Sequence, residues 1–252
     1  MITHNGGMRI AALSDIHGNL QALEAVLADL DHRSVDVTVN LGDLLSGGLQ
    51  PRETAERLIP LGLPTVRGNH ERQVLSTSPD EMGPSDRLAD QMMLPHHVAW
   101  FESLPLTLKI AAGVKLFHGS PTDDLTYLLD TVDENGARAA TEAEVLHRIG
   151  TETGWALMLC GHTHLPRAMR LSSGTLIVNP GSVGWPAYQD EKPYPHVMEA
   201  GTPHARYATV DDKTGRWEAT FHSVEYDWET SAHIAENNGR PDVARALLTG
   251  RV

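Results

Sequence analysis

Carboxylate, imidazole and carboxamide side chains recur in five short motifs, each placed where an apolar run of the sequence ends. Nitrogen and oxygen donors of this kind bind metal ions, and imidazole-rich sets favour manganese, iron, cobalt, nickel or zinc over magnesium. Seven such donors exceed the needs of one tetrahedral zinc ion but suit two cations that share a bridging carboxylate. The candidate ligands are Asp15, His17, Asp43, Asn69, His118, His162 and His164.

Two of the motifs contain a pair of candidate ligands separated by one residue. Side chains two positions apart in extended backbone project from the same face. We therefore expect Asp15 and His17 to aim at one common point, and His162 and His164 to do the same.

The motifs follow segments that the sequence predicts to be β-strands. Residues 9–14, 35–40 and 64–67 are apolar or β-branched, and the segments 20–30 and 51–61 between them have helical periodicity. Alternating units of this kind favour a parallel sheet with right-handed crossovers. Because ligands gather at the carboxyl ends of strands in open α/β sheets, the five motif loops should converge on one rim.

The remaining sequence predicts one α/β domain over residues 8–252, preceded by a tail at residues 1–7. No regular pattern is evident over 76–95, and the polar segment 123–154 is typical of a helix-rich insertion without strands. Strands are expected at 107–110, 114–118, 155–160, 167–171, 175–178, 205–210 and 216–224, and helices at 96–103, 227–238 and 241–248.

Composition excludes several classes of protein. The 252 residues have 40% hydrophobic content and a net charge of −13, which fits a folded globular chain and opposes binding to nucleic acid. No apolar run approaches the roughly 20 residues of a membrane span, and no secretory signal is evident. A single cysteine, Cys160, cannot form an internal disulfide, so we expect a cytoplasmic protein, and a homo-oligomer stays open.

The ordered set of motifs resembles the calcineurin-like metallophosphoesterase superfamily, with its pattern D-x-H, G-D, G-N-H-[DE], H and G-H-x-H. The stretch Asn179-Pro180-Gly181-Ser182 is similar to the N-P-G-S of its small bacterial members. The resemblance implies a four-layer αββα sandwich with the site at the strand ends. It also implies that Asp15, His17 and His164 hold one metal ion, that Asn69, His118 and His162 hold the other, and that Asp43 bridges them.

In that family, a metal-bound hydroxide attacks phosphorus, so Asp43 would be catalytic as well as a ligand. His70, which follows Asn69, would protonate the leaving oxygen or hold a phosphate oxygen. The protein phosphatases of the superfamily extend the second motif to G-D-x-x-D-R-G, whereas the chain has Gly42-Asp43-Leu44-Leu45-Ser46-Gly47-Gly48. The arginine clamp and the aspartate that orients the histidine are missing from this motif, which counts against a phosphoprotein phosphatase.

The leading hypothesis is a phosphodiesterase that acts on a small or nucleotide-like phosphate ester, because few arginines are evident near the motifs to bind a dianionic monoester. The alternatives are a phosphomonoesterase or dinucleoside-polyphosphate hydrolase, a non-catalytic scaffold of the same fold, and a metal site for storage or sensing.

Several further residues have two readings each. Arg67 could touch phosphate or form a buried ion pair, and the turn at 179–182 could bind an anion or support the metal loops. Trp185 and Tyr188 could stack on a base or serve in packing, and Cys160 is expected in the core.

Overall fold

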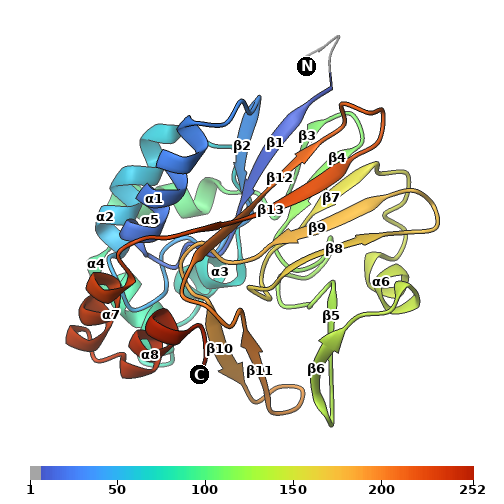
Figure 1. The fold of residues 1–252 in the computed structure, drawn as a ribbon. Coiled ribbons are helices and arrows are strands. Elements are labelled where there is room, and N and C mark those ends of the chain that lie inside the picture. The colour runs from blue at the N-terminus through green and yellow to red at the C-terminus, as the bar shows by residue number, and fades with distance from the viewer. Residues whose placement is uncertain (1–6) are drawn as a thin grey trace.

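Two β-sheets packed face to face form the centre of the structure, a computed structural model that describes residues 7–252 (Figure 1). The first sheet has the order β13-β12-β1-β2, and β12 is antiparallel to both of its neighbours. The second has the order β3-β4-β7-β9-β8, with β4, β7 and β9 parallel and both edge strands antiparallel. The strands are β1 (Arg9–Leu13), β2 (Val37–Asn40), β3 (Thr107–Ala111), β4 (Val114–Phe117), β7 (Leu157–Leu159), β8 (Pro166–Arg170), β9 (Leu176–Pro180), β12 (Ala205–Asp211) and β13 (Glu218–Val224).

Strand β1 shows how the layers are held together. Ile10 and Ala12 point into the core between the two sheets, whereas Ala11 and Leu13 pack in the core beneath the helices. This alternation follows from the period of two in a strand, and both faces are apolar because both are covered. A third core, which includes Phe117, lies on the outer face of the second sheet. The chain therefore has the four layers of an αββα sandwich, as expected.

Helices cover the outer face of the first sheet, while a single helix, α6, lies against the second sheet in the described part of the chain (Figure 1). None of the helices in residues 7–252 combines the length and the apolar character that crossing a membrane requires. They are α1 (Leu20–Asp31), α2 (Pro51–Leu58), the 3₁₀ turn η1 (Ile59–Leu61), α3 (Asn69–Ser76), α4 (Pro84–Met92), α5 (Pro95–Ser103), α6 (Glu142–Ile149), α7 (Trp228–Asn237) and α8 (Pro241–Thr249).

Four sequence-based expectations are wrong. The sheets are mixed rather than parallel, because the later strands join as antiparallel neighbours. Residues 64–67 form no strand but one bridge between Thr65 and Asn40. The segment 123–154 contains a hairpin, β5 (Asp130–Asp133) and β6 (Gly136–Ala139), as well as α6. Residues 76–95, where no pattern was evident, contain α4.

A second unexpected hairpin, β10 (Ala187–Asp190) with β11 (His196–Glu199), follows the turn after β9. Its four-residue strands are partly exposed and polar, which is why their periodicity is weak. The hairpin contacts α8 through β10 and the β5–β6 hairpin through β11 (Figure 1). The expected tail at residues 1–7 lies outside the described residues, apart from Gly7.

Candidate metal centre

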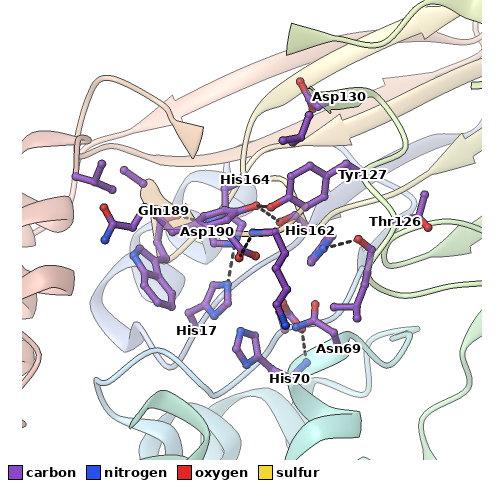
Figure 2. Close-up of a pocket in the computed structure, with 18 of the residues that line it drawn as sticks. His17, Asn69, His70, Thr126, Tyr127, Asp130, His162, His164, Gln189 and Asp190 are labelled. Carbon is purple, nitrogen blue, oxygen red and sulfur yellow. Dashed lines mark hydrogen bonds between the residues drawn. The ribbon is translucent and has the colours of Figure 1, made fainter. Parts of the chain in front are cut away.

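The loops after β1, β2, β4 and β7 meet the start of α3 at one end of the two sheets, as the rim hypothesis predicted. All seven candidate ligands lie in these loops or at this helix start, and Figure 2 shows His17, Asn69, His162 and His164 around one pocket. The face-to-face packing of the two sheets brings them together, because the loop after β1 in the first sheet and the loop after β7 in the second lie at the same end of the sandwich.

One group of donors consists of Asp15, His17 and His164. The Nε2 atoms of His17 and His164 lie 2.9 Å apart. Oδ1 of Asp15 lies 3.9 Å from Nε2 of His17 and 3.5 Å from Nε2 of His164. Three donors from two loops thus face a common point at the end of β1.

The second group is built around the side-chain amide of Asn69. Its oxygen lies 3.0 Å from Nε2 of His118, and the same amide position is 3.0 Å from Nδ1 of His162 and 3.2 Å from Oδ2 of Asp43. Oδ2 of Asp43 is also 3.2 Å from Nε2 of His118. The donor atoms of Asp43 fall within 4.8 Å of both this group and His17, so this carboxylate stands between the two groups.

Hydrogen bonds to main-chain carbonyls fix which ring nitrogens face the centre. Nδ1 of His17, His118 and His164 lies 2.6, 2.7 and 2.6 Å from the carbonyl oxygens of Ser46, Leu41 and Trp185. A ring nitrogen that bonds a carbonyl oxygen must carry the proton, so Nε2 is the atom that each of these rings turns toward the centre. In His162 the roles are reversed, because Nε2 bonds the carbonyl oxygen of Leu125 at 3.1 Å.

The backbone of this region is strained at the same residues. Asp15, His17, Asp43, His162 and His164 have φ between 52° and 73°, and no other non-glycine residue among 7–252 has a positive φ. Left-handed backbone costs about 1 kcal/mol or more for a residue with a side chain. The extended backbone expected for the two pairs is therefore wrong. Asp15 and His17 nevertheless face one common point, as expected, whereas His162 and His164 point into different groups.

Burial sets the protonation of the imidazoles. It lowers the pKa of His17 to about 4 and that of His162 to about 3, and it lowers the pKa of His164 as well. Burial opposes a charge on His118 too, but the carboxylate of Asp43 outweighs it and raises this pKa to about 10. Burial raises the pKa of Asp15 to about 7. The three neutral rings have free lone pairs, as metal ligands require.

The donor set fits metal ions. The lone pairs on Nε2 of the neutral rings of His17 and His164 face each other at 2.9 Å, a contact that is repulsive unless a cation lies between them. A donor set of four imidazoles with two carboxylates and a carboxamide suits first-row transition metals.

The family model of the calcineurin-like phosphoesterase superfamily domain matches residues 8–200 of the chain. The chain belongs to this superfamily. An uncharacterized protein of Methanocaldococcus jannaschii is 28% identical over 257 residues, which cover 96% of this chain and 98% of the relative. A metallophosphoesterase crystal structure from Sphaerobacter thermophilus is similar with a TM-score of 0.74 at 26% identity, over 97% of this chain and 99% of that one. A hypothetical protein from Pyrococcus horikoshii OT3 shares the fold with a TM-score of 0.75 at 18% identity, over 96% and 98% of the two chains.

In this member of the calcineurin-like phosphoesterase superfamily, His70 has the aspartate partner that the second motif lacks. Nδ1 of His70 lies 2.7 Å from Oδ1 of Asp86, a largely buried residue in the first turn of α4. Burial lowers the pKa of His70, but Asp43 and Asp86 outweigh it and raise this pKa to about 9. No pattern in the sequence indicates this partner, because residues 76–95, which contain α4, show no clear helical period.

Glu71, the last residue of the G-N-H-E motif, ties two ligand loops together. Its carboxylate accepts hydrogen bonds from the backbone N–H groups of Asp43 and Gly68 at 2.9 and 2.8 Å and from that of Leu44 at 2.7 Å. Burial raises the pKa of Glu71 to about 7. A Cβ atom on Gly68 would lie 2.2 Å from Oδ1 of Asp43, so the two loops approach as closely as glycine allows.

The turn at 179–182 supports the ligand loops. Asn179 Nδ2 donates to the carbonyl oxygen of Gly161 at 2.6 Å and to Oγ1 of Thr163 at 3.0 Å, between the two ligands of the last motif. Ser182 Oγ donates to the carbonyl oxygen of Asp15 at 2.8 Å. Both polar side chains already bind the loops that carry the candidate ligands. The turn at 179–182 therefore supports these loops and is not free to bind an anion.

The structure also shows the surroundings of the remaining residues for which the sequence left two roles open. Trp185 packs edge-on against the ring of His17, with centroids 5.1 Å apart, and Tyr188 packs against His164 at 4.7 Å. Arg67 does not line the pocket and makes no ion pair within residues 7–252, so neither expected role is seen. Cys160 is buried in the core, as expected, and burial raises the pKa of its thiol.

The ligands form the floor of a cavity of about 1050 Å³ whose walls come from the two hairpins and α8. Tyr188 Oη donates to Tyr127 Oη at 2.6 Å, and Tyr127 Oη lies 3.1 Å from Nε2 of His196. These contacts join the segment 123–154 to the β10–β11 hairpin directly above the ligands. Neither tyrosine contact was predicted from the sequence.

Proposed function

We propose that the chain is a phosphodiesterase that uses two divalent transition-metal ions to hydrolyse a small or nucleotide-like phosphate ester. The proposal rests on family membership and on the convergence of the donors. Asp43 would contact both ions. The other ligands would be Asp15, His17 and His164 for one ion and Asn69, His118 and His162 for the other.

One contact carries the proposal, namely the 2.9 Å separation between Nε2 of His17 and Nε2 of His164. Both rings use their Nδ1 proton on a carbonyl oxygen, and burial keeps the pKa of each below neutrality. No proton is left to join the two lone pairs, so a cation between them and Asp15 best explains the arrangement.

Bound cations of this kind polarise phosphoryl oxygens and lower the pKa of a coordinated water. The residues of the chain supply the remaining functions. His70 Nδ1 is bonded to Asp86, so its Nε2 can donate a proton to the leaving oxygen of the ester. The main-chain carbonyl oxygens of Ser46, Leu41 and Trp185 accept hydrogen bonds from Nδ1 of three candidate ligand rings and hold these rings in place before substrate binds.

A second candidate function is hydrolysis of a dinucleoside polyphosphate or a monoester. The premise that few basic residues lie near the site is wrong, because Arg240, Arg245 and Lys192 line the cavity wall. They come from the loop of the β10–β11 hairpin and from the start of α8 and its interior, far in sequence from the motifs. These cations favour a substrate with more negative charge than a simple diester.

The test combines metal analysis with hydrolysis of bis(p-nitrophenyl) phosphate and p-nitrophenyl phosphate in the presence of Mn²⁺. We expect two ions per chain and faster hydrolysis of the diester. In Asp43→Asn the metal content should fall to one ion or none and turnover should be lost, while the exposed control Asp31→Asn should keep both.

Metal bound without hydrolysis of either ester would reject the enzyme and favour a sensing or storage site. A chain without stoichiometric metal would favour the non-catalytic scaffold. Two retained ions in Asp43→Asn would reject the bridging role of Asp43.

A further inference from the structure

Three segments outside the ligand loops build the wall of the cavity. They are α8, the loop that joins β10 to β11, and the β5–β6 hairpin with the residues just before it. Figure 2 shows Gln189 on one side and Thr126 on the other, with His17 and His70 between them. A cavity of about 1050 Å³ is larger than one phosphate group needs and matches the size of pockets for whole organic ligands.

Trp185 connects the floor of the cavity to α8. Its ring packs against the candidate ligand His17, with centroids 5.1 Å apart, and the guanidinium of Arg240 lies 5.5 Å above the same ring. Arg240 is the residue that precedes α8. The first turn of this helix is therefore two side-chain contacts away from the candidate metal centre.

Two of the basic side chains that line the cavity are already engaged. Arg240 donates to both carboxylate oxygens of Asp242, at 2.9 and 2.6 Å, and also bonds Ser85. Arg148 donates to the carbonyl oxygens of Leu128 and Asp130 at 3.0 and 2.9 Å. The donors of both side chains therefore bind within the wall, and the charge of Arg240 is paired with that of Asp242.

Lys192 and Arg245 differ from these residues. Both are exposed and line the cavity, and within residues 7–252 neither side chain makes a hydrogen bond or an ion pair. Lys192 lies in the β10–β11 loop and Arg245 lies on α8, and β10 and α8 are in contact. In a chain with a net charge of −13, two unpaired cations therefore face one cavity from adjacent elements.

The acidic side chains of the wall do not neutralise them. Asp242 is paired with Arg240, and Asp130 is paired with Arg167 at 2.8 Å. Asp190 accepts the backbone N–H of Lys192 at 3.0 Å and has no cationic side-chain partner in the described residues. Among the described side chains of the wall, Arg148, Lys192 and Arg245 pair with no carboxylate, whereas only Asp190 pairs with no cation. This excess of positive charge favours one additional anionic group on the ligand.

We propose that Lys192 and Arg245 bind a second phosphate group of the substrate, separate from the phosphate that is cleaved. This inference rests on the proposed function, because it assumes that the scissile phosphate binds at the metal centre. The organic body between the two phosphates would lie along the apolar wall that Trp185, Ala187 and Val132 provide. The substrate class is thus a nucleotide-like phosphodiester or phosphoanhydride that carries a further phosphate.

The test compares two chromogenic diesters that differ in one phosphate, thymidine 5′-(p-nitrophenyl phosphate) with and without a 3′-phosphate. In the wild type with Mn²⁺ we expect a KM that is lower for the 3′-phosphorylated ester. Lys192→Gln combined with Arg245→Gln should raise that KM about tenfold, since each exposed ion pair contributes modestly. In this double variant, kcat for both esters should stay within about twofold of the wild-type value. The KM of the ester without a 3′-phosphate should also stay within about twofold.

The control is Lys213→Gln combined with Arg216→Gln, which removes the same two charges from the exposed β12–β13 turn outside the cavity. Its KM and kcat values for both esters should match those of the wild type. Equal KM values for the two esters in the wild type, or equal effects of the two double variants, would overturn the second phosphate site and leave the proposed function intact. If the metal-loaded wild type hydrolysed neither ester, the proposed function itself would fail.

Discussion

Asp86 and His70 form a pair in which one residue sets the orientation of the other. The two are 16 positions apart, on α4 and α3, and their 2.7 Å contact leaves one ring nitrogen of His70 to face the cavity. A donor that is held in one orientation loses less entropy when it transfers a proton to a leaving group. Asp86 thus acts through His70 and does not itself touch substrate.

We predict that Asp86→Asn slows the hydrolysis of esters with poor leaving groups by about 100-fold, the lower range for general acid catalysis. Esters of p-nitrophenol need little protonation and should be slowed far less. The measurement is turnover of a series of aryl phosphodiesters whose leaving groups differ in pKa.

Asp90→Asn provides the control for this series, because Asp90 lies one turn further along α4 and makes no described contact with His70. A uniform loss across all leaving groups in Asp86→Asn would show that Asp86 has only a structural role.

Metal affinity should depend on pH through two of the ligands. In the metal-free chain the pKa of His118 is about 10 and that of Asp15 is about 7, so each binds a proton that a cation must displace. Affinity should therefore rise with pH, about tenfold per unit above pH 7 from His118 alone, and more steeply below pH 7. Calorimetric titration with Mn²⁺ between pH 6 and 8 measures this slope, and affinity that does not change with pH would contradict it.

At the scale of elements, the candidate metal centre depends on how closely the start of α3 approaches the loop that follows β2. Gly68 caps α3 with φ of −89°, and Gly83 caps α4 with φ of −61°, so any residue could adopt either backbone. The difference is space, since a Cβ atom on Gly68 meets the carboxylate of Asp43 and one on Gly83 meets nothing within 4 Å.

We predict that Gly68→Ala displaces the carboxylate of Asp43 and reduces bound metal by at least one ion per chain. Gly83→Ala should retain the metal content of the wild type and fold equally well. Metal analysis with circular dichroism distinguishes loss of the site from loss of the fold. Full metal content in Gly68→Ala would show that the α3 start can move away from β2 without cost.

At the scale of the whole molecule, the ligand loops store strain that bound cations should relieve. Five ligands have left-handed backbone, and buried lone pairs face one another at the centre. The strain and the facing lone pairs lower the stability of the metal-free chain, but they leave the site already in the shape that binds cations.

We predict that saturating Mn²⁺ raises the melting temperature by about 5–10 °C over chain treated with a chelator. Ligand at 100 times its Kd adds about 2.7 kcal/mol of unfolding free energy, and each kcal/mol shifts the midpoint by roughly 2–4 °C in a chain of this size. Differential scanning calorimetry measures the shift, and Asp43→Asn should reduce it. An unchanged midpoint would show that the loops bind no ion.

The sequence by itself indicated the candidate ligands, and its resemblance to a family indicated the four layers. Motifs at strand ends identify donors because the carboxyl ends of neighbouring strands share an edge, and the apolar residues on both faces of β1 require cover on both sides. Short polar strands such as β5 and β10 were missed because their partly exposed residues lack a clear period.

Only the tertiary structure decided which side chains from elsewhere complete the site. The pairing of His70 with Asp86, the tyrosine contact between two hairpins, and the placement of Lys192 and Arg245 in one cavity all join segments far apart in the chain. Such contacts depend on where α4, α8 and the hairpins pack. That packing follows from burial summed over many residues, and no local spacing encodes it.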